Sequence, residues 1–292
     1  MKNRCLRSLC ITLVTLASAA GAAENAGHES FLWRVKSGGR TVSLLGSIHY
    51  MKAGSYPLSP AIEGAFKGAG IVVFETDIDQ MGKAAVSLLA AGTLSGEDTL
   101  KDVVPKELYR EVSQRFDDLG MGIGAFDKMK PWMVAMSLTS YELMRGGYLG
   151  SEGIDSHFSS RAKTEGKPQQ GLETIEFQTS LFVDLSAEES VEFLQYTMTD
   201  LDTMIPLIDE IVVAWKRGDS ARIEELLVDG FSDHEALYDR LVTQRNLRWL
   251  PQIEELFRGD VDAMVVVGSL HLVGEQGLIE LLRAKGFEVE QL

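Results

Sequence analysis

The sequence predicts an α/β fold: a central mixed, mostly parallel sheet built from both chain ends, with flanking helices and a helical insertion in the middle. The short apolar run 71–74 has the character of a strand buried on both faces, and a second apolar run, 263–267, is also typical of a strand. They stand far apart in the chain, and much of the sequence between them has the three- or four-residue apolar spacing of helices. A sheet completed by both termini accounts for this order.

Local signals define the individual elements. The Ser-Gly-Gly-Arg turn at 37–40 between two β-rich runs predicts a hairpin. Ser59 followed by Pro60 is an N-cap with proline in the first turn. In chain order, we expect strands at 31–35 and 41–45, a helix from Ser59 to about Gly68, a strand at 71–74, helices beginning near Thr99, Pro131 and Gly153, a strand at 168–172, helices over about 187–215 and 233–257, a strand at 263–267, a helix over 276–284 and a last strand at 287–292.

The first 23 residues have the order of a secretory signal peptide. Three basic residues, Lys2, Arg4 and Arg7, precede an apolar run at 9–16 and a small-residue stretch at 17–23. The apolar run is shorter than the roughly 20 residues that a bilayer-spanning helix needs, which disfavours the alternative of an uncleaved anchor. We therefore expect a signal peptide at 1–23, a single domain at 24–292 with its helical insertion at roughly 98–165, and export, with the periplasm favoured over the medium.

Composition narrows the partners. Both cysteines, Cys5 and Cys10, lie in the leader, so the remaining chain can form no disulfide or cysteine-based metal site. The formal net charge of −15 becomes −18 when the three basic leader residues are removed. Such an acidic surface repels nucleic acid and anionic lipid. We expect a peptide or small-molecule substrate, no nucleic acid and no membrane span after cleavage; the oligomeric state stays open.

One pattern occurs twice. An apolar run ends in Gly46-Ser-Ile-His49, and a second run ends in Gly268-Ser-Leu-His271. Glycine permits a sharp exit from a strand, and each histidine then falls just past the strand's carboxyl end. Ligands of open α/β folds bind at that end. A histidine after a strand is by itself more often a capping or core residue, but the repeated setting favours a site.

Glu75 is the third member of the candidate site. It ends the apolar run 71–74, where a carboxylate is costly unless it is paired or bound to a metal. If the three strands are neighbours, two imidazoles and one carboxylate converge. His49, His271 and Glu75 would form a divalent-metal set, and a water on the open position could attack a carbonyl. The alternative without a functional role is that Glu75 simply begins a turn.

Arg245 stands inside the apolar stripe of the last long helix, four residues from both Leu241 and Trp249. An arginine there needs an anionic partner, either Glu75 or a developing oxyanion, unless it snorkels to solvent. Asn246 beside it could orient a ligand. Glu173 could face the same cleft, with a surface role equally compatible. Weaker candidates are Asp155 and His157, which open a helix, where Asp155 could serve only the helix dipole. His28 and His234 have the character of surface residues.

Taken together, these residues resemble the TraB/GumN family (TraB/PrgY/GumN), which is related to the Tiki metalloproteases and more distantly to erythromycin esterase-like and ChaN-like proteins. The resemblance covers about 31–292. The motifs that carry it are Gly46-Ser-Ile-His49, Phe74-Glu75, Gly153-Ile-Asp155, Gly171-Leu-Glu-Thr174, Arg245-Asn246 and Gly268-Ser-Leu-His-Leu-Val-Gly-Glu-Gln-Gly277-Leu278.

The resemblance implies an α/β core with paired Gly-x-x-His loops and, in Tiki-like members, a metal-dependent peptidase site that favours manganese or cobalt. We therefore expect an exported metal-dependent hydrolase, a peptidase by preference. Its metal would be held by His49, His271 and Glu75, with zinc and iron as alternative ions. Glu75 as base or ligand, Arg245, Asn246 and Glu173 would be the catalytic residues. The competing expectation is a non-catalytic envelope protein that sequesters a peptide, a saccharide or an iron-bearing ligand.

Overall fold

A computed structural model describes residues 30–228 and 235–292. The leader 1–23, both cysteines, His28 and His234 lie outside the described residues, so the expectations placed on them stay predictions.

A six-stranded mixed sheet is the centre of the fold, as the sequence predicted. Its order is β6-β4-β7-β2-β1-β8. The three pairs among β6, β4, β7 and β2 are parallel, and the pairs β2–β1 and β1–β8 are antiparallel. The strands are β1 (Leu32–Ser37), β2 (Arg40–Ser47), β4 (Ile71–Phe74), β6 (Gln169–Gly171), β7 (Ala263–Gly268) and β8 (Glu288–Gln291), beside a two-stranded sheet of β3 (Met51–Lys52) and β5 (Tyr148–Leu149).

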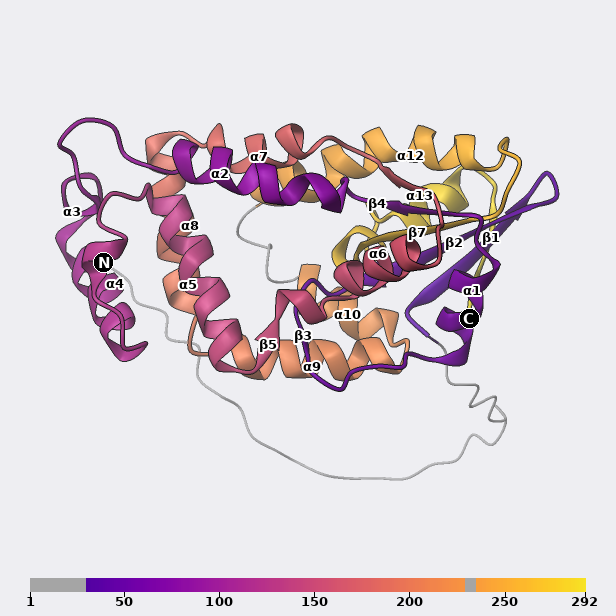
Figure 1. Ribbon diagram of the computed structural model, residues 1–292, viewed down its shortest axis with the longest axis horizontal. Coiled ribbons are helices and arrows are strands. Elements are labelled where there is room, and N and C mark those ends of the chain that lie inside the picture. The colour runs from indigo at the N-terminus through magenta and orange to yellow at the C-terminus, as the bar shows by residue number, and fades with distance from the viewer. Residues whose placement is uncertain (1–29, 229–234) are drawn as a thin grey trace, which may run out of the picture.

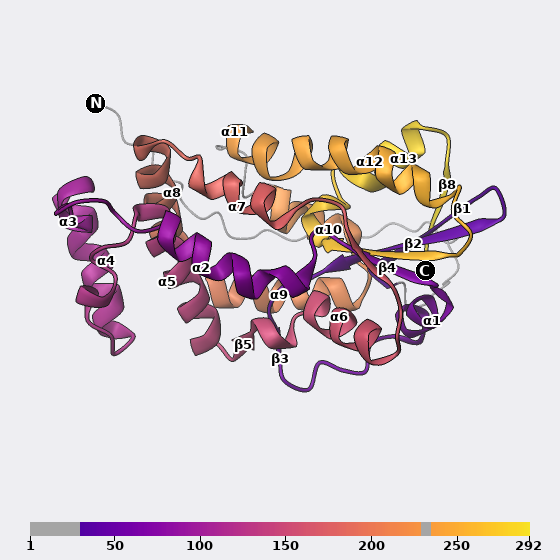
Figure 2. The ribbon, with the colours of Figure 1, turned by 45° about the horizontal axis from the view of Figure 1, so that its top comes forward.

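Both chain ends complete the sheet (Figure 1). The strand β7 comes from the C-terminal part of the chain and inserts between β4 and β2, and all six of its residues are buried. We expected a strand here, and its burial on both faces, typical of a central parallel strand, explains the uninterrupted apolar run at 263–267. The last strand, β8, pairs with β1 of the N-terminal hairpin. Figure 2 shows α12 and α13 on one side of the sheet and α1 and α6 on the other.

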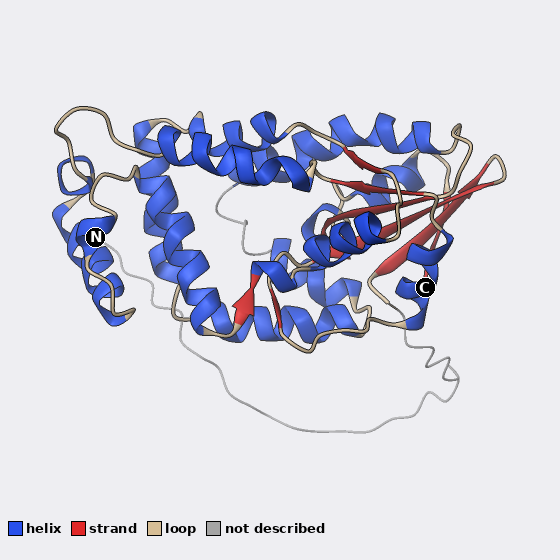
Figure 3. Ribbon diagram, viewed as in Figure 1, coloured by secondary structure: helices blue, strands red, loops and turns tan. Residues whose placement is uncertain are grey.

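The helices account for most of the remaining chain (Figure 3). Their bounds are α1 (Pro60–Gly68), α2 (Met81–Ala91), α3 (Leu100–Val103), α4 (Lys106–Asp118), α5 (Pro131–Arg145), α6 (Ile154–Thr164), α7 (Ile175–Val183), α8 (Ala187–Asp200), α9 (Met204–Lys216), α10 (Ser220–Val228), α11 (Glu235–Tyr238), α12 (Gln244–Leu256) and α13 (Leu278–Ala284).

Two expected helices are each divided in two. Proline explains both divisions. Pro105 forces an extended residue before it, so α3 ends and α4 begins there instead of one helix running on from Thr99. Pro206 lacks the N–H that a continuous helix over 187–215 would require, and the chain restarts at Met204, which places this proline in the first turn of α9. Helices α2, α7 and α10 were not anticipated.

A second hydrophobic core lies away from the sheet. It gathers apolar side chains from α3, α4, α5 and α8, including Phe116, Leu138 and Leu194. These helices form the left end of the molecule in Figure 1. Helix α6 packs instead on the main core through Ile154 and Phe158. The insertion that we placed at roughly 98–165 therefore holds residues of both cores, and its boundaries stay a prediction. Among the described residues, no helix is long and apolar enough to cross a membrane.

Candidate functional site

Three strands bring the predicted site together. The order β4-β7-β2 makes these strands neighbours, and all run parallel. The register pairs Phe74 with Val266 and Ser47 with Gly268, so the three carboxyl ends lie side by side. The loops that carry His49, Glu75 and His271 therefore leave the same edge of the sheet, as the repeated Gly-Ser-x-His pattern predicted.

Glu75 is buried at the centre of this edge, with 6% of its surface exposed. One carboxylate oxygen, Oε1, accepts from the backbone N–H of Gly268 at 2.7 Å. The other, Oε2, accepts from Arg245 Nη2 at 2.5 Å and from Gln178 Nε2 at 3.1 Å. Burial alone would raise the pKa of the Glu75 carboxyl, but the positive charge of Arg245, aided by His49 and the backbone N–H of Gly268, holds that pKa well below its usual range. Glu75 is therefore a carboxylate at neutral pH.

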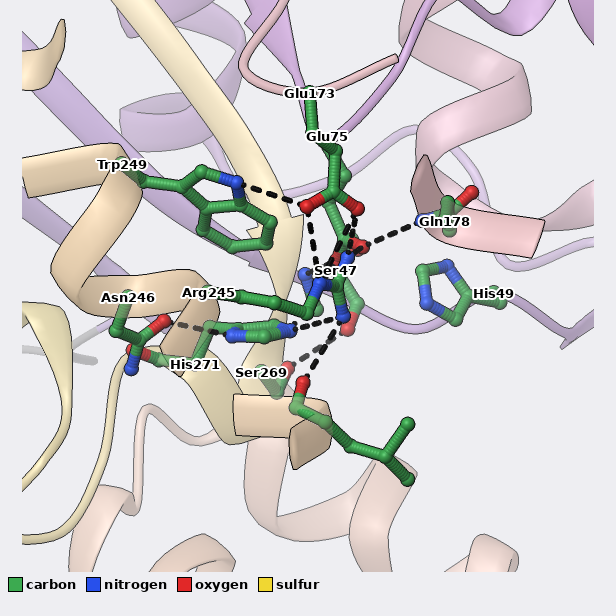
Figure 4. Close-up of polar contacts among 12 residues, drawn as sticks. Ser47, His49, Glu75, Glu173, Gln178, Arg245, Asn246, Trp249, Ser269 and His271 are labelled. Atoms are coloured by element: carbon green, nitrogen blue, oxygen red, sulfur yellow. Dashed lines mark hydrogen bonds and ion pairs between the residues drawn. The ribbon is translucent and has the colours of Figure 1, made fainter. Parts of the chain in front are cut away.

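Arg245 satisfies all five of its N–H donors inside the protein (Figure 4). Its Nη2 reaches Glu75 and Glu173, at 2.5 and 2.6 Å. Its Nε faces Glu173 at 3.2 Å, and its Nη1 donates to the Leu241 carbonyl and to His271 Nε2, at 3.1 and 3.0 Å. The guanidinium also lies 4.6 Å from the centre of the Trp249 ring. With 6% of the residue exposed, the snorkelling alternative does not hold.

Glu173 lies in the same cluster, which removes the alternative of a surface role. Only 6% of its side chain is exposed. Besides the bonds to Arg245, its Oε2 accepts from Trp249 Nε1 at 3.1 Å. Burial raises the pKa of Glu173, and Arg245 opposes that rise. Two buried carboxylates thus share one guanidinium, and the cluster carries one net negative charge when both are ionised.

His271 is buried and held in one tautomer. Asn246 Nδ2 donates to the carbonyls of His271 and Gln276, so its Oδ1 is the acceptor that His271 Nδ1–H meets at 2.7 Å. His271 Nε2 then presents its lone pair to Arg245. Burial, aided by Arg245, lowers the pKa of His271 to about 3, so the ring is neutral. Asn246 is fully buried, and its hydrogen bonds to His271 orient this imidazole. Its expected role in positioning a ligand stays a prediction.

His49 lies at the exposed side of the cluster, with 59% of its side chain accessible. Its Nδ1 forms a hydrogen bond with Asp155 Oδ2 at 2.8 Å. Asp155 raises the pKa of His49 to about 9. Gly153 makes this contact possible, because a Cβ on that residue would lie 2.2 Å from the His49 carbonyl oxygen. Asp155 thus has a partner in the site as well as a place in the first turn of α6.

Some of the site could not be read from the sequence. Gln178 belongs to α7, which carries no motif and was not anticipated as a helix. The Leu241 carbonyl reaches Arg245 from a π-helical segment, Asp239–Thr243, that directly precedes α12. Such segments are frequent at functional sites. His157 does not join the cluster; its ring stacks on Tyr56 at 3.8 Å between centroids.

The pKa values of the two site histidines should be shifted in opposite directions in the metal-free protein, upward for His49 and downward for His271. At pH 7 we expect ¹⁵N NMR of labelled histidine to show His49 as an imidazolium and His271 as a neutral Nδ1–H tautomer. An unfolded histidine takes up its proton near pH 6.5, whereas folded His271 does so only near pH 3. His271 should therefore lower the free energy of unfolding as the pH falls through that range. A protonated His271 at pH 6 would contradict this arrangement.

The donor chemistry fits a divalent metal ion. His49 and His271 each have one ring nitrogen held by an orienting partner, as is usual for metal-binding histidines, and Glu75 is ionised; the second ring nitrogen of His271 accepts from Arg245. Yet across residues 30–228 and 235–292, no three His, Cys, Asp or Glu side chains are arranged as a metal-binding group. The cationic group in contact with Glu75 and His271 is instead the guanidinium of Arg245, which donates a hydrogen bond to each of them.

Comparison with known proteins identifies relatives. A family model described as the TraB/PrgY/gumN family matches residues 31–291. The chain is 27% identical over 246 residues to uncharacterized protein YbaP of Escherichia coli (strain K12), an alignment that covers 84% of this chain and 89% of that protein. It is 21% identical to metalloprotease TIKI2 of Danio rerio, over 89% of this chain and 60% of that protein. No solved structure gives a significant match.

Proposed function

This chain belongs to the TraB/PrgY/gumN family, and we propose that it is an exported, metal-dependent hydrolase that acts on peptides. The observation that supports this most strongly is the arrangement of three groups at one sheet edge: a neutral imidazole, a buried carboxylate and an exposed imidazole, each with its orientation fixed by a neighbour. The distant similarity to a protein named a metalloprotease supports the same reaction class.

His49, His271 and Glu75 would hold the ion, with manganese or cobalt favoured and zinc or iron as alternatives. When bound, such an ion supplies an acidified water and polarises a carbonyl. The protein's own groups prepare the site: Asn246 fixes the tautomer of His271 and Asp155 orients His49. Both contacts set where the remaining ring nitrogens face.

Arg245 and Gln178 keep Glu75 in place and ionised. Of the two roles expected for Arg245, holding Glu75 is the one for which a contact exists. Its donors are already satisfied, so service to an oxyanion would require it to give up a present partner. Substrate would approach from the side of His49, the exposed member of the site.

Peptide cleavage should depend on added metal. We expect the purified protein to hydrolyse a mixed peptide library, EDTA to abolish this turnover, and Mn²⁺ or Co²⁺ to restore it. Identified cleavage products would give the substrate preference. Turnover that persists in EDTA after dialysis would contradict metal dependence, because a hydrolase that relies on the ion for its nucleophile has no replacement for it.

One observation favours a second candidate, a non-catalytic envelope protein that binds a peptide, a saccharide or an iron-bearing ligand. The cluster of Glu75, Glu173, Arg245 and His271 is already satisfied by its own hydrogen bonds. A site of that kind needs no ion to remain folded. Stoichiometric binding of a ligand without any product would support this alternative.

Export is the remaining part of the proposal. It is supported by the basic, apolar and small-residue order of residues 1–23. We expect the protein recovered from a bacterial periplasmic extract to begin near Ala23, as intact mass and N-terminal sequencing would show. Full-length protein that remains in the cell membrane fraction would contradict cleavage and favour the anchor.

A further inference from the structure

Arg245 and a metal ion would compete for the same atom. His271 Nε2 has one lone pair, and it accepts a hydrogen bond from Arg245 Nη1 at 3.0 Å. A metal ligated by that nitrogen needs the same lone pair. The two states are therefore mutually exclusive at His271, whichever ion binds.

Electrostatics reinforce the competition. The guanidinium lies against both carboxylates, with Nη2 at 2.5 Å from Glu75 and 2.6 Å from Glu173. An incoming divalent cation would meet this positive charge within a site that is largely shielded from water, where like charges repel strongly. Arg245 thus satisfies the buried carboxylate and imidazole in the absence of metal and opposes the arrival of one.

The contacts of Arg245 also indicate how it could release His271. Its Nε and Nη2 are held by Glu173, and Nη1 donates to the Leu241 carbonyl as well as to His271. Release of His271 would leave Nη1 with the Leu241 bond, so Arg245 would lose one hydrogen bond and keep its other partners. The Leu241 carbonyl belongs to the π-helical segment Asp239–Thr243.

From these contacts we infer that Arg245 is a built-in counter-cation that occupies the metal site in the metal-free protein, and that metal uptake requires the Arg245–His271 hydrogen bond to break. This inference rests on the proposed metal-dependent function and deepens it. It assigns to Arg245 a control of metal affinity, in addition to its hold on Glu75.

The test uses a charge-balanced double variant. Arg245→Met alone would leave two carboxylates without a counter-charge, so any gain in metal affinity could be ascribed to charge. Arg245→Met with Glu173→Gln keeps the single net negative charge of the cluster and leaves an amide oxygen as acceptor for Trp249 Nε1. It also frees His271 Nε2. Arg248→Met is the matched control, because Arg248 is an exposed arginine on the same helix that lies over Phe177.

We expect the double variant to bind Mn²⁺ about tenfold to a hundredfold more tightly than the wild type, since metal no longer has to replace a charge-assisted hydrogen bond. Isothermal titration calorimetry of the metal-stripped proteins measures this, and the rise in Tm with added Mn²⁺ provides a second reading. Glu173→Gln alone, which keeps Arg245 on His271, and Arg248→Met should not bind more tightly than the wild type. A further His271→Ala substitution should abolish the gained binding.

Each other result is decisive. Equal affinity in the wild type and the double variant overturns the inference and leaves the proposed metal dependence standing. Absence of Mn²⁺ and Co²⁺ binding in every variant overturns both. Tight binding that survives His271→Ala overturns the inference as well, because the ion then lies elsewhere. If the double variant does not fold, Arg245→Lys tests the hydrogen bond alone, because it keeps the positive charge while a single ammonium nitrogen replaces the three nitrogens of the guanidinium; a smaller gain in Mn²⁺ affinity is then expected, and an affinity equal to that of the wild type would overturn the inference.

Discussion

Replacement of His271 by alanine is expected to lower peptide hydrolysis by more than about 100-fold, because changes to groups that merely orient a ligand typically cost 10–100-fold and this change removes the ligand itself. The His271 ring lies just past the end of β7, where it contacts the Trp249 ring, and its Nε2 lone pair faces Arg245. His49→Ala should produce a comparable loss from the exposed side of the site. Steady-state kcat/KM on a cleaved peptide, with circular dichroism to verify folding, measures the effect.

His157→Ala is the matched control for this loss. His157 is a partly buried histidine on α6, two residues after Asp155, yet it packs on Tyr56 and does not reach the cluster. Its replacement should leave kcat/KM within a few fold of the wild type. Undiminished turnover in both His49→Ala and His271→Ala would refute the assignment of the paired loops to catalysis.

Removal of Arg245 should have the largest effect on stability. Arg245→Met retains an aliphatic side chain but removes the guanidinium that lies over Trp249, and it leaves Glu75 and Glu173 buried without their counter-charge. Loss of one partner from a buried ion cluster typically costs about 3–5 kcal/mol. We therefore expect the free energy of unfolding to fall by about this amount, as urea denaturation in EDTA at pH 7 would show.

The exposed Arg248→Met variant should change that free energy by no more than about 0.5 kcal/mol. Addition of Glu173→Gln to Arg245→Met should recover part of the loss, because one of the two uncompensated charges disappears. An unchanged urea midpoint for Arg245→Met would mean that the cluster contributes little to the fold and that its short contacts do not reflect a strong interaction.

The sheet and the convergence of the site could be predicted because they depend on local signals with long-range consequences. Two buried strands that end in the same Gly-Ser-x-His sequence had to meet if they were parallel neighbours, and β7 does lie beside both β2 and β4. Arg245 was recognisable as an arginine in an apolar stripe. Its need for an anion followed from burial alone.

The full set of partners of Arg245 could not be predicted from the sequence. No spacing rule connects Arg245 with Glu173, with His271 or with the Leu241 carbonyl, because these contacts depend on how α12 is placed over the sheet edge. Gln178 was missed for a different reason. It lies on α7, whose apolar residues do not form one clear stripe, so neither the helix nor its contact with Glu75 was anticipated.

Metal content tests the central proposal most directly. The chain from residue 24 onward, purified without a histidine tag or chelator, would be assayed by elemental mass spectrometry before and after soaking with each ion, with His49→Ala and His271→Ala alongside. We expect manganese, cobalt, iron or zinc at close to one equivalent in the wild type and loss of that metal in both variants. Absence of metal from the soaked wild-type protein, or an ion that both variants retain, would contradict a metal centre built on the paired loops and leave the binding protein as the better account.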